Sequence, residues 1–115
     1  MITIYGIKNC DTMQKAFKWL DAKQIKYTFH NYKEAGIDKA TLAYWLKHIP
    51  ADKLINTKST TYRELPDTEK DCIASNTKAV KVMMNNPSII KRPLWDFGND
   101  HFLLGWNEKE LSELL

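Results

Sequence analysis

Residues 1–16 read Met1-Ile-Thr-Ile-Tyr5-Gly-Ile-Lys-Asn-Cys10-Asp-Thr-Met-Gln-Lys15-Ala, and this stretch decides how the rest of the chain folds. The alternation of β-branched and polar residues in its first five positions predicts a short strand. Apolar side chains then recur with the helical period at Met13, Ala16, Phe17 and Leu20, which predicts an amphipathic helix. Cys10 therefore falls in the turn between a strand and a helix.

A cysteine at this place has an unusual electrostatic environment. The first backbone N–H groups of the helix, from about Asp11 to Met13, have no acceptor within the helix, and the helix dipole adds partial positive charge beside the sulfur. Both effects favour the thiolate over the thiol. We therefore predict Cys10 to be a nucleophile, with these N–H groups and the Thr12 hydroxyl as stabilisers and Lys8 as an anion holder.

A lone cysteine in a small domain is often an inert apolar residue, but the position of Cys10 argues against this alternative. Cys10 follows Gly6 in a turn, has the polar neighbours Asn9 and Asp11, and lies close to Lys8 and Lys15 in sequence. A buried apolar cysteine normally lies within a helix or a strand. The surroundings of Cys10 thus favour a reactive thiol, whereas Cys72, beside Ile73 in a predicted helix, is expected to be buried and inert.

Composition predicts one compact α/β domain over residues 1–115. The 115 residues are 43% hydrophobic and 27% charged, and two cysteines cannot form a disulfide framework. Three scattered histidines, His30, His48 and His101, predict no zinc site and no bound cofactor. A net charge of +3 with two arginines argues against a nucleic-acid partner. Without a leader or a long apolar segment, the chain is expected to be cytoplasmic and not membrane-bound.

The remaining elements follow in the order strand, helical region, strand pair and helix. Residues 27–31 predict a second strand, parallel to the first. A helix capped by Asp38 and stapled by Ile37 onto Leu42 precedes a series of shorter pieces. These pieces are residues 52–56, residues 62–65, a helix capped by Thr68 and a helix capped by Asn76 or Thr77. Residues 94–97 and 101–104 predict a hairpin around Gly98, and Asn107 begins a last helix with Leu111 on its apolar face.

Three separated motifs together resemble one protein family. They are the segment around Cys10, Ile90-Lys-Arg92-Pro93-Leu, and Leu103-Leu-Gly-Trp-Asn107-Glu, and they are similar to the arsenate-reductase-related ArsC/Spx family, most of all to its YffB-type branch. The resemblance covers essentially the whole chain. It implies a thioredoxin-like fold, with a mixed four-stranded sheet built from β-α-β and then β-β-α, and an all-helical insertion at approximately residues 34–86.

The same resemblance assigns a role to Arg92 and Pro93. It implies that Pro93 is a cis-proline facing the active cysteine, and X-Pro bonds adopt the cis form far more readily than other peptide bonds. Arg92 would then direct its guanidinium toward Cys10, stabilise the thiolate and hold a carboxylate of the substrate or of glutathione. Without the resemblance, Arg92 reads as a surface residue before a strand.

Departures from the family pattern distinguish the branches. The resemblance implies three arginines around the cysteine in arsenate reductases, but only Arg92 has a counterpart, since Asn56 and Gly105 stand at the other two positions. Each missing charge-assisted hydrogen bond is worth roughly 1.5–3 kcal/mol, so efficient arsenate reduction is not expected. Spx regulators carry a C-x-x-C switch, and in this chain Met13 stands where the second cysteine of that motif would be.

A nucleophilic thiol without a neighbouring cysteine needs an external thiol to resolve its mixed disulfide. We therefore expect a glutathione-dependent thiol-disulfide reductase, with glutathione as co-substrate. The alternatives are an Spx-like regulatory protein that binds RNA polymerase, so a protein partner stays open, and an arsenate reductase. A Cys-His hydrolase would need His30 or His101 near the cysteine, which the sequence does not show.

Overall fold

The computed structural model describes residues 2–115, and a four-stranded mixed sheet forms its centre. The strands lie in the order β2-β1-β3-β4. β1 pairs in parallel with β2 and antiparallel with β3, which in turn pairs antiparallel with β4. The bounds of the strands are β1 Ile2–Gly6, β2 Tyr27–Asn31, β3 Leu94–Gly98 and β4 His101–Leu104.

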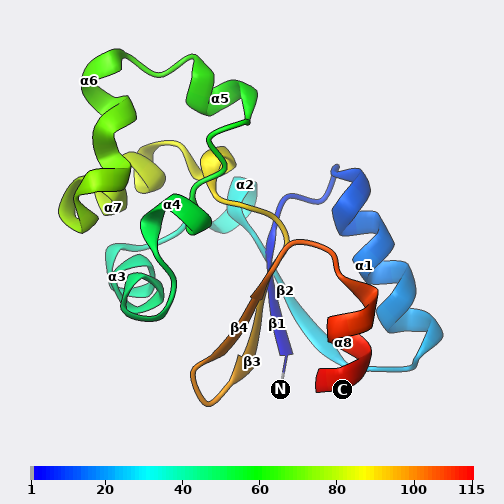
Figure 1. The fold of residues 1–115 in the computed structure, drawn as a ribbon. Coiled ribbons are helices and arrows are strands. Elements are labelled where there is room, and N and C mark those ends of the chain that lie inside the picture. The colour runs from blue at the N-terminus through cyan, green and yellow to red at the C-terminus, as the bar shows by residue number, and fades with distance from the viewer. Residues whose placement is uncertain (1) are drawn as a thin grey trace.

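Two helices, α1 (Asp11–Ala22) and α8 (Glu108–Leu114), cover one face of the sheet (Figure 1). Because neighbouring side chains of a strand point to opposite faces, Ile2 and Ile4 of β1 pack under these helices, with Trp95 of β3. The cluster is completed by the buried helical side chains Met13, Ala16, Leu20 and Leu111.

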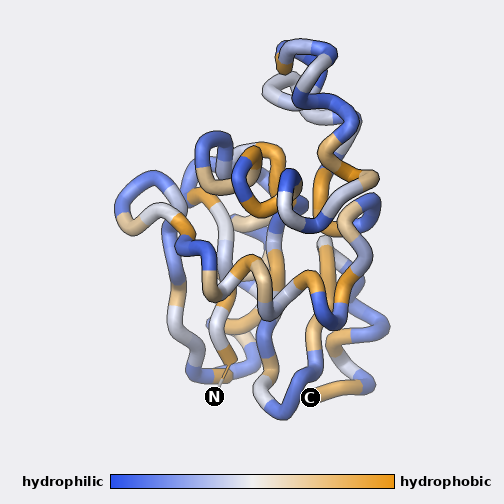
Figure 2. Tube along the Cα trace, turned by 90° about the vertical axis from the view of Figure 1, so that its left-hand side faces the viewer, coloured by the Kyte–Doolittle hydropathy of each residue, from blue (hydrophilic) through white to orange (hydrophobic). Residues whose placement is uncertain are grey.

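A chain of short helices between β2 and β3 covers the other face (Figure 1). These helices are α2 Tyr32–Ala35, α3 Lys39–His48, α4 Ala51–Leu54, α5 Thr60–Arg63, α6 Asp67–Lys70, the 3-10 helix η1 Asp71–Ala74, α7 Asn76–Asn85 and the 3-10 helix η2 Pro87–Ile89. Their apolar side chains pack with Leu94 and with the half-buried Tyr5 of the sheet. The segment with α5 and α6 projects farthest from the sheet and is largely hydrophilic (Figure 2).

This arrangement is the thioredoxin-like α/β fold that was predicted, and several of the expected helix ends are confirmed. The Asp38 carboxylate accepts a hydrogen bond from the Thr41 N–H at 2.7 Å, and the Asn107 side chain accepts one from the Glu110 N–H at 3.0 Å. Both residues therefore cap their helices as expected. In residues 2–115 no helix is long and apolar enough to span a membrane.

Three expected helix starts were wrong. α7 is capped by Ser75, whose hydroxyl accepts from the Lys78 N–H, and not by Asn76 or Thr77. No helix is capped by Thr68, because α6 already begins after Pro66, whose fixed φ suits a helix start.

The piece expected at residues 62–65 instead begins at Thr60, because the Ser59 hydroxyl caps it by accepting from the Tyr62 N–H. In α5 and α7 a serine takes the cap position through its hydroxyl, whereas α6 begins after Pro66 without a side-chain cap.

Gly105 joins β4 to the segment before α8 in a backbone conformation with φ of +83°, which L-residues rarely adopt. Its N–H donates to the Pro93 carbonyl at 2.8 Å, and its carbonyl accepts from Trp95 Nε1 at 2.9 Å. The strain of a side chain at this point would act on the segment that carries Pro93.

We expect Gly105→Ala to lower the free energy of unfolding by about 1–2 kcal/mol, because an L-residue is strained in the left-handed region. Urea denaturation followed by tryptophan fluorescence measures the change. Asn99→Gly is the matched control, because Asn99 has a φ of 53° and gains freedom from strain. Its stability should stay within about 0.5 kcal/mol of the parent. An equal loss in both variants would contradict the role given to the backbone of Gly105.

Candidate active site

Cys10 stands at the N-terminus of α1, directly after the loop that leaves β1. It is the N-cap residue, with an extended backbone (φ −132°, ψ 129°), and its carbonyl accepts the first hydrogen bond of the helix from the Gln14 N–H at 2.9 Å. The side chain of Gln14 also closes the loop, because its Nε2 donates to the Lys8 carbonyl at 2.7 Å. Gln14 in the first turn of α1 thus holds the loop between β1 and α1, which we call the cysteine loop, through the carbonyls of Lys8 and Cys10.

Gly6 allows this turn to pack onto the end of β1. A Cβ atom at Gly6 would lie 2.6 Å from Met13 Sδ and 2.8 Å from Met13 Cε, closer than such atoms approach each other. Met13 is itself fully buried under the sheet. The absence of a side chain at position 6 therefore sets how closely α1, and with it Cys10, approaches the sheet.

The second half of the site comes from the neighbouring strand. Tyr5 pairs with Leu94, so the Arg92–Pro93 segment lies beside the loop that leads to Cys10. The Arg92–Pro93 peptide bond is cis, and Pro93 is buried while Arg92 is partly exposed. Arg92 Nη1 donates to the Ser88 carbonyl of η2 at 2.9 Å, which fixes the direction of the guanidinium.

The environment of Cys10 favours its thiolate. Partial burial raises the pKa of the thiol, but the Met13 and Thr12 backbone N–H groups and the Arg92 guanidinium together outweigh burial, and the pKa lies below its ordinary value. The sulfur makes no side-chain capping hydrogen bond, so we attribute this effect to electrostatic attraction from the two N–H groups rather than to a tight cap. Cys10 therefore forms a thiolate more readily than an ordinary cysteine does, which favours a nucleophilic role.

The predicted site residues take different places around the sulfur. Thr12 and Met13 act through their backbone N–H groups, whereas the sequence had also suggested the hydroxyl of Thr12. Asp11 is exposed as the first residue of α1, and its carboxylate adds negative charge near the thiolate. Lys8 is also exposed, and its carbonyl, not its ammonium, is held by the helix.

Two residues of the site were missed by the sequence analysis. Gln14 ties the loop at Lys8 to α1, and the Ser88 carbonyl orients Arg92. Gln14 lies about one helical turn after Cys10, and this spacing could have indicated a side chain that reaches back to the cysteine loop. Ser88 acts through its backbone, so its side chain carried no signal.

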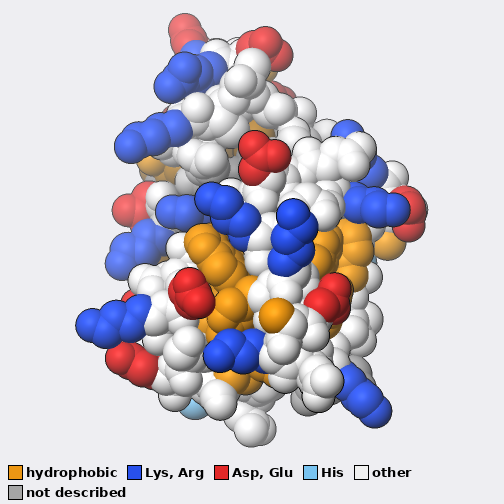
Figure 3. Space-filling model, turned by 90° about the vertical axis from the view of Figure 1, so that its right-hand side faces the viewer, with side chains coloured by type: hydrophobic (Ala, Val, Ile, Leu, Met, Phe, Trp, Pro, Cys, Tyr) orange, Lys and Arg blue, Asp and Glu red, His pale blue; other side chains and the backbone are white. Residues whose placement is uncertain are grey.

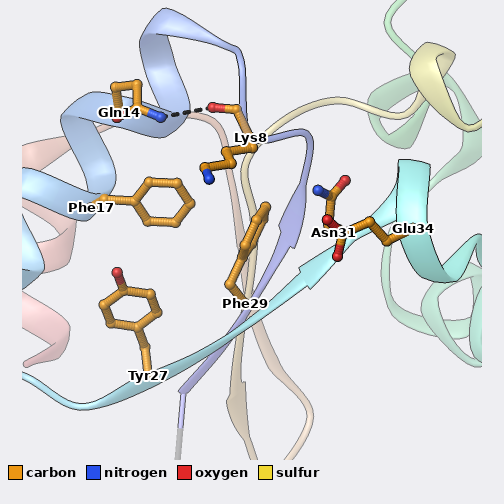
Figure 4. Close-up of a pocket in the computed structure, with 7 residues that line it drawn as sticks. All are labelled: Lys8, Gln14, Phe17, Tyr27, Phe29, Asn31 and Glu34. Carbon is orange, nitrogen blue, oxygen red and sulfur yellow. Dashed lines mark hydrogen bonds between the residues drawn. The ribbon is translucent and has the colours of Figure 1, made fainter.

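A pocket of about 410 Å³ opens on the α1 side of β2 (Figure 4). Phe17, Tyr27 and Phe29 form its aromatic wall, with the ring centroids of Phe17 and Phe29 4.9 Å apart. Lys8 points into this pocket above Phe29. Hydrophobic side chains likewise gather in the middle of the face that carries α1, with Lys, Arg, Asp and Glu around them (Figure 3).

Cys72 lies in a different part of the molecule. It is fully buried in the cluster formed by the helical region, as expected, and burial raises the pKa of its thiol. Cys10 instead packs against the cluster under α1, and both thiols are free. Cys72 is thus unsuited to resolve a disulfide formed at Cys10.

The histidines do not supply a base for Cys10. His30 Nε2 lies 2.6 Å from the Gly36 carbonyl, and His101 is exposed at the hairpin end of β4, away from the end where Cys10 lies. Among residues 2–115, no group of three or more His, Cys, Asp and Glu side chains is placed to hold a metal ion. The reactivity of Cys10 therefore rests on the helix N-terminus and Arg92.

We expect Arg92→Ala to raise the pKa of Cys10, because both the hydrogen bond and the positive charge of the guanidinium lower it. The measurement is the rate of alkylation by iodoacetamide against pH in a Cys72→Ser background, whose midpoint should move to higher pH. Arg63→Ala is a matched control, since Arg63 is exposed on α5. A midpoint that stays in place in Arg92→Ala, or moves equally in both variants, would contradict the role of Arg92.

Comparisons with known proteins agree with this geometry. The model of the ArsC family matches residues 5–114. An uncharacterized protein from Haemophilus influenzae is 42% identical over 110 residues, which cover 96% of this chain and 95% of that protein. The global transcriptional regulator Spx of Staphylococcus aureus is 26% identical, with 100% of this chain and 87% of the regulator covered.

A solved structure of a YffB protein superimposes with a TM-score of 0.92 at 36% identity, covering 98% of this chain and 97% of that chain. The family model matches nearly the whole length of the chain, and the superposition on this structure agrees with the fold. The chain belongs to the ArsC family.

Proposed function

We propose that this protein is a glutathione-dependent thiol-disulfide reductase that works through Cys10 alone. The observation that carries the proposal is a thiol of lowered pKa, held between a helix N-terminus and Arg92, with the second cysteine buried in another cluster. A nucleophile of this kind reacts with disulfides but cannot resolve the product by itself.

The reaction consists of three exchanges. The Cys10 thiolate attacks one sulfur of a disulfide, a new S–S bond forms to Cys10, and the other half leaves as a thiolate, which takes up a proton. A glutathione thiolate then attacks the substrate sulfur of the mixed disulfide, which releases Cys10 and leaves this half of the substrate bonded to glutathione. A second glutathione thiolate attacks the glutathione sulfur of that disulfide and releases the second substrate thiol. Over a full cycle two glutathione molecules are oxidised to glutathione disulfide while the substrate disulfide is reduced to two thiols, so electrons balance.

The residues around the sulfur have separate roles in these steps. Thr12 and Met13 direct their N–H groups at the thiolate and stabilise it as attacking and as leaving group. Arg92 adds a positive charge that favours the same state and is positioned to hold a substrate carboxylate. Pro93, cis and buried, precedes the strand residue that pairs with Tyr5, and we assign it to the substrate-binding side of the site. The chemistry requires a reducing compartment, so we place the protein in the cytoplasm.

Turnover should depend on Cys10 and not on Cys72. With glutathione and bis(2-hydroxyethyl) disulfide, Cys10→Ser should abolish the reduction and Cys72→Ser should retain it. Arg92→Ala should lower kcat/KM about tenfold to hundredfold, the cost of one charge-assisted hydrogen bond. A coupled glutathione reductase assay measures all three. Retained turnover in Cys10→Ser would overturn the proposal.

Arsenate should be a poor substrate with the same co-substrate. Asn56 carries no charge, and a φ of +83° at Gly105 opposes the side chain that the family pattern would place there. We expect arsenate turnover with glutathione to stay at the level of Cys10→Ser, while disulfide turnover exceeds it clearly. Arsenate reduction that depends on Cys10 and equals disulfide reduction would favour the arsenate reductase alternative.

A further inference from the structure

A second pocket lies beside the segment that carries Arg92. It has a volume of about 460 Å³ and is formed by the α4–α5 connection, by Lys91 and by the end of β4 at Leu104. We call it the lysine pocket, because its charged side chains are Lys53, Lys58 and Lys91 with one carboxylate, Asp52. The site described above uses none of these side chains.

Backbone hydrogen bonds hold the walls of the lysine pocket in place. Lys91 N–H donates to the Leu54 carbonyl at 2.8 Å, and Asn56 N–H donates to the Ile89 carbonyl at 2.7 Å. The Asn56 side chain in turn accepts from the Lys58 N–H at 3.1 Å, which sets the turn that carries Lys58. The lysines therefore project from a fixed frame rather than from a loose loop.

The walls of the lysine pocket are neighbours in the chain of the residues around Cys10. Lys91 directly precedes Arg92, and Lys91 lines the pocket whereas the Arg92 guanidinium contacts Cys10. Next to Leu104, which also lines the pocket, the Gly105 N–H donates to the Pro93 carbonyl at 2.8 Å. Two residues of the pocket are thus joined directly to the segment that carries Arg92 and Pro93.

The side chain of Lys91 lies beside Gly105. A Cβ atom at position 105 would lie 3.6 Å from Lys91 Cε, an ordinary van der Waals contact, so the lysine stem borders the glycine. An arginine at position 105 would therefore have Lys91 as a direct neighbour.

The charge of the lysine pocket is not balanced by the protein. None of the ion pairs among residues 2–115 involves Lys53, Lys58 or Lys91. Three ammonium groups around one concave surface attract anions, and Asp52 offers a place for one cation. A volume of about 460 Å³ exceeds that of a single oxyanion and fits an elongated small molecule.

We propose that the lysine pocket binds the carboxylates of glutathione, or of the glutathionyl half of a disulfide, while its sulfur reaches Cys10. This inference rests on the proposed function. Glutathione carries two carboxylates and one ammonium group, which complements three lysines and one aspartate. A tripeptide spans about 10 Å when extended, so its carboxylates and its sulfur can occupy separate parts of one elongated site.

The test measures the binding of a glutathione analogue that cannot form a disulfide with the protein. S-methylglutathione is titrated into Cys10→Ser by NMR or calorimetry, alone and with Lys58→Gln and Lys91→Gln combined. We expect the two substitutions to raise Kd about twofold to thirtyfold, as the loss of two exposed ion pairs would. Lys47→Gln with Lys109→Gln is the matched control, because it removes the same charge from exposed positions on α3 and α8.

The diethyl ester of S-methylglutathione separates carboxylate binding from other effects. It should bind Cys10→Ser more weakly than the acid, and the loss of Lys58 and Lys91 should change its Kd less than twofold. An equal loss for acid and ester, or for the control pair of lysines, would overturn the proposal.

A further comparison distinguishes this inference from the proposed function. Mass spectrometry follows the mixed disulfide that native Cys10 forms with glutathione disulfide. If no mixed disulfide forms but the titration shows the expected loss, the reductase function is wrong and the pocket is supported. If the mixed disulfide forms at the same rate with and without Lys58 and Lys91, the pocket is wrong and the function is supported.

Discussion

The site depends on the pairing of β1 with β3. β1 ends one loop before Cys10, and β3 begins directly after Pro93, so the antiparallel register Tyr5 to Leu94 places the two halves of the site at the same end of the sheet. They come from opposite ends of the chain and share no local contact that would bring them together. A slip of one residue would reverse the faces of β3 and move Arg92 away from the sulfur. The buried Trp95, on the face under α1, opposes such a slip.

Two opposing effects set the state of Cys10. Burial disfavours a charged sulfur, whereas the helix N-terminus and Arg92 favour it, and the favourable effects are larger. The balance depends on distance, because the attraction falls as α1 moves away from the sheet. Gly6 and Met13 hold that distance through a contact that leaves no space for a Cβ atom. The packing of α1 on the sheet therefore helps to set the charge state of Cys10.

Sequence reasoning predicted the elements that periodicity and capping determine, and the family resemblance supplied the long-range arrangement. The helix after Cys10 and the caps Asp38 and Asn107 follow from local chemistry, so they were predictable. The start of α7 was missed because Ser75 competes with its neighbours for one cap position. The Ser88 contact could not be predicted either, since a backbone carbonyl is present at every residue and only the fold selects this one.

The lysine pocket shows how one backbone conformation can alter what a site selects. A φ of +83° at Gly105 excludes an unstrained side chain, so no arginine from β4 can turn toward the sulfur without strain. Lys91 occupies the adjacent space and lines the lysine pocket, and of the two cations it is Arg92 that acts on the Cys10 thiol. A small tetrahedral anion at the sulfur therefore meets one arginine. A longer molecule gains from both Arg92 and the lysines, because it spans the segment between them.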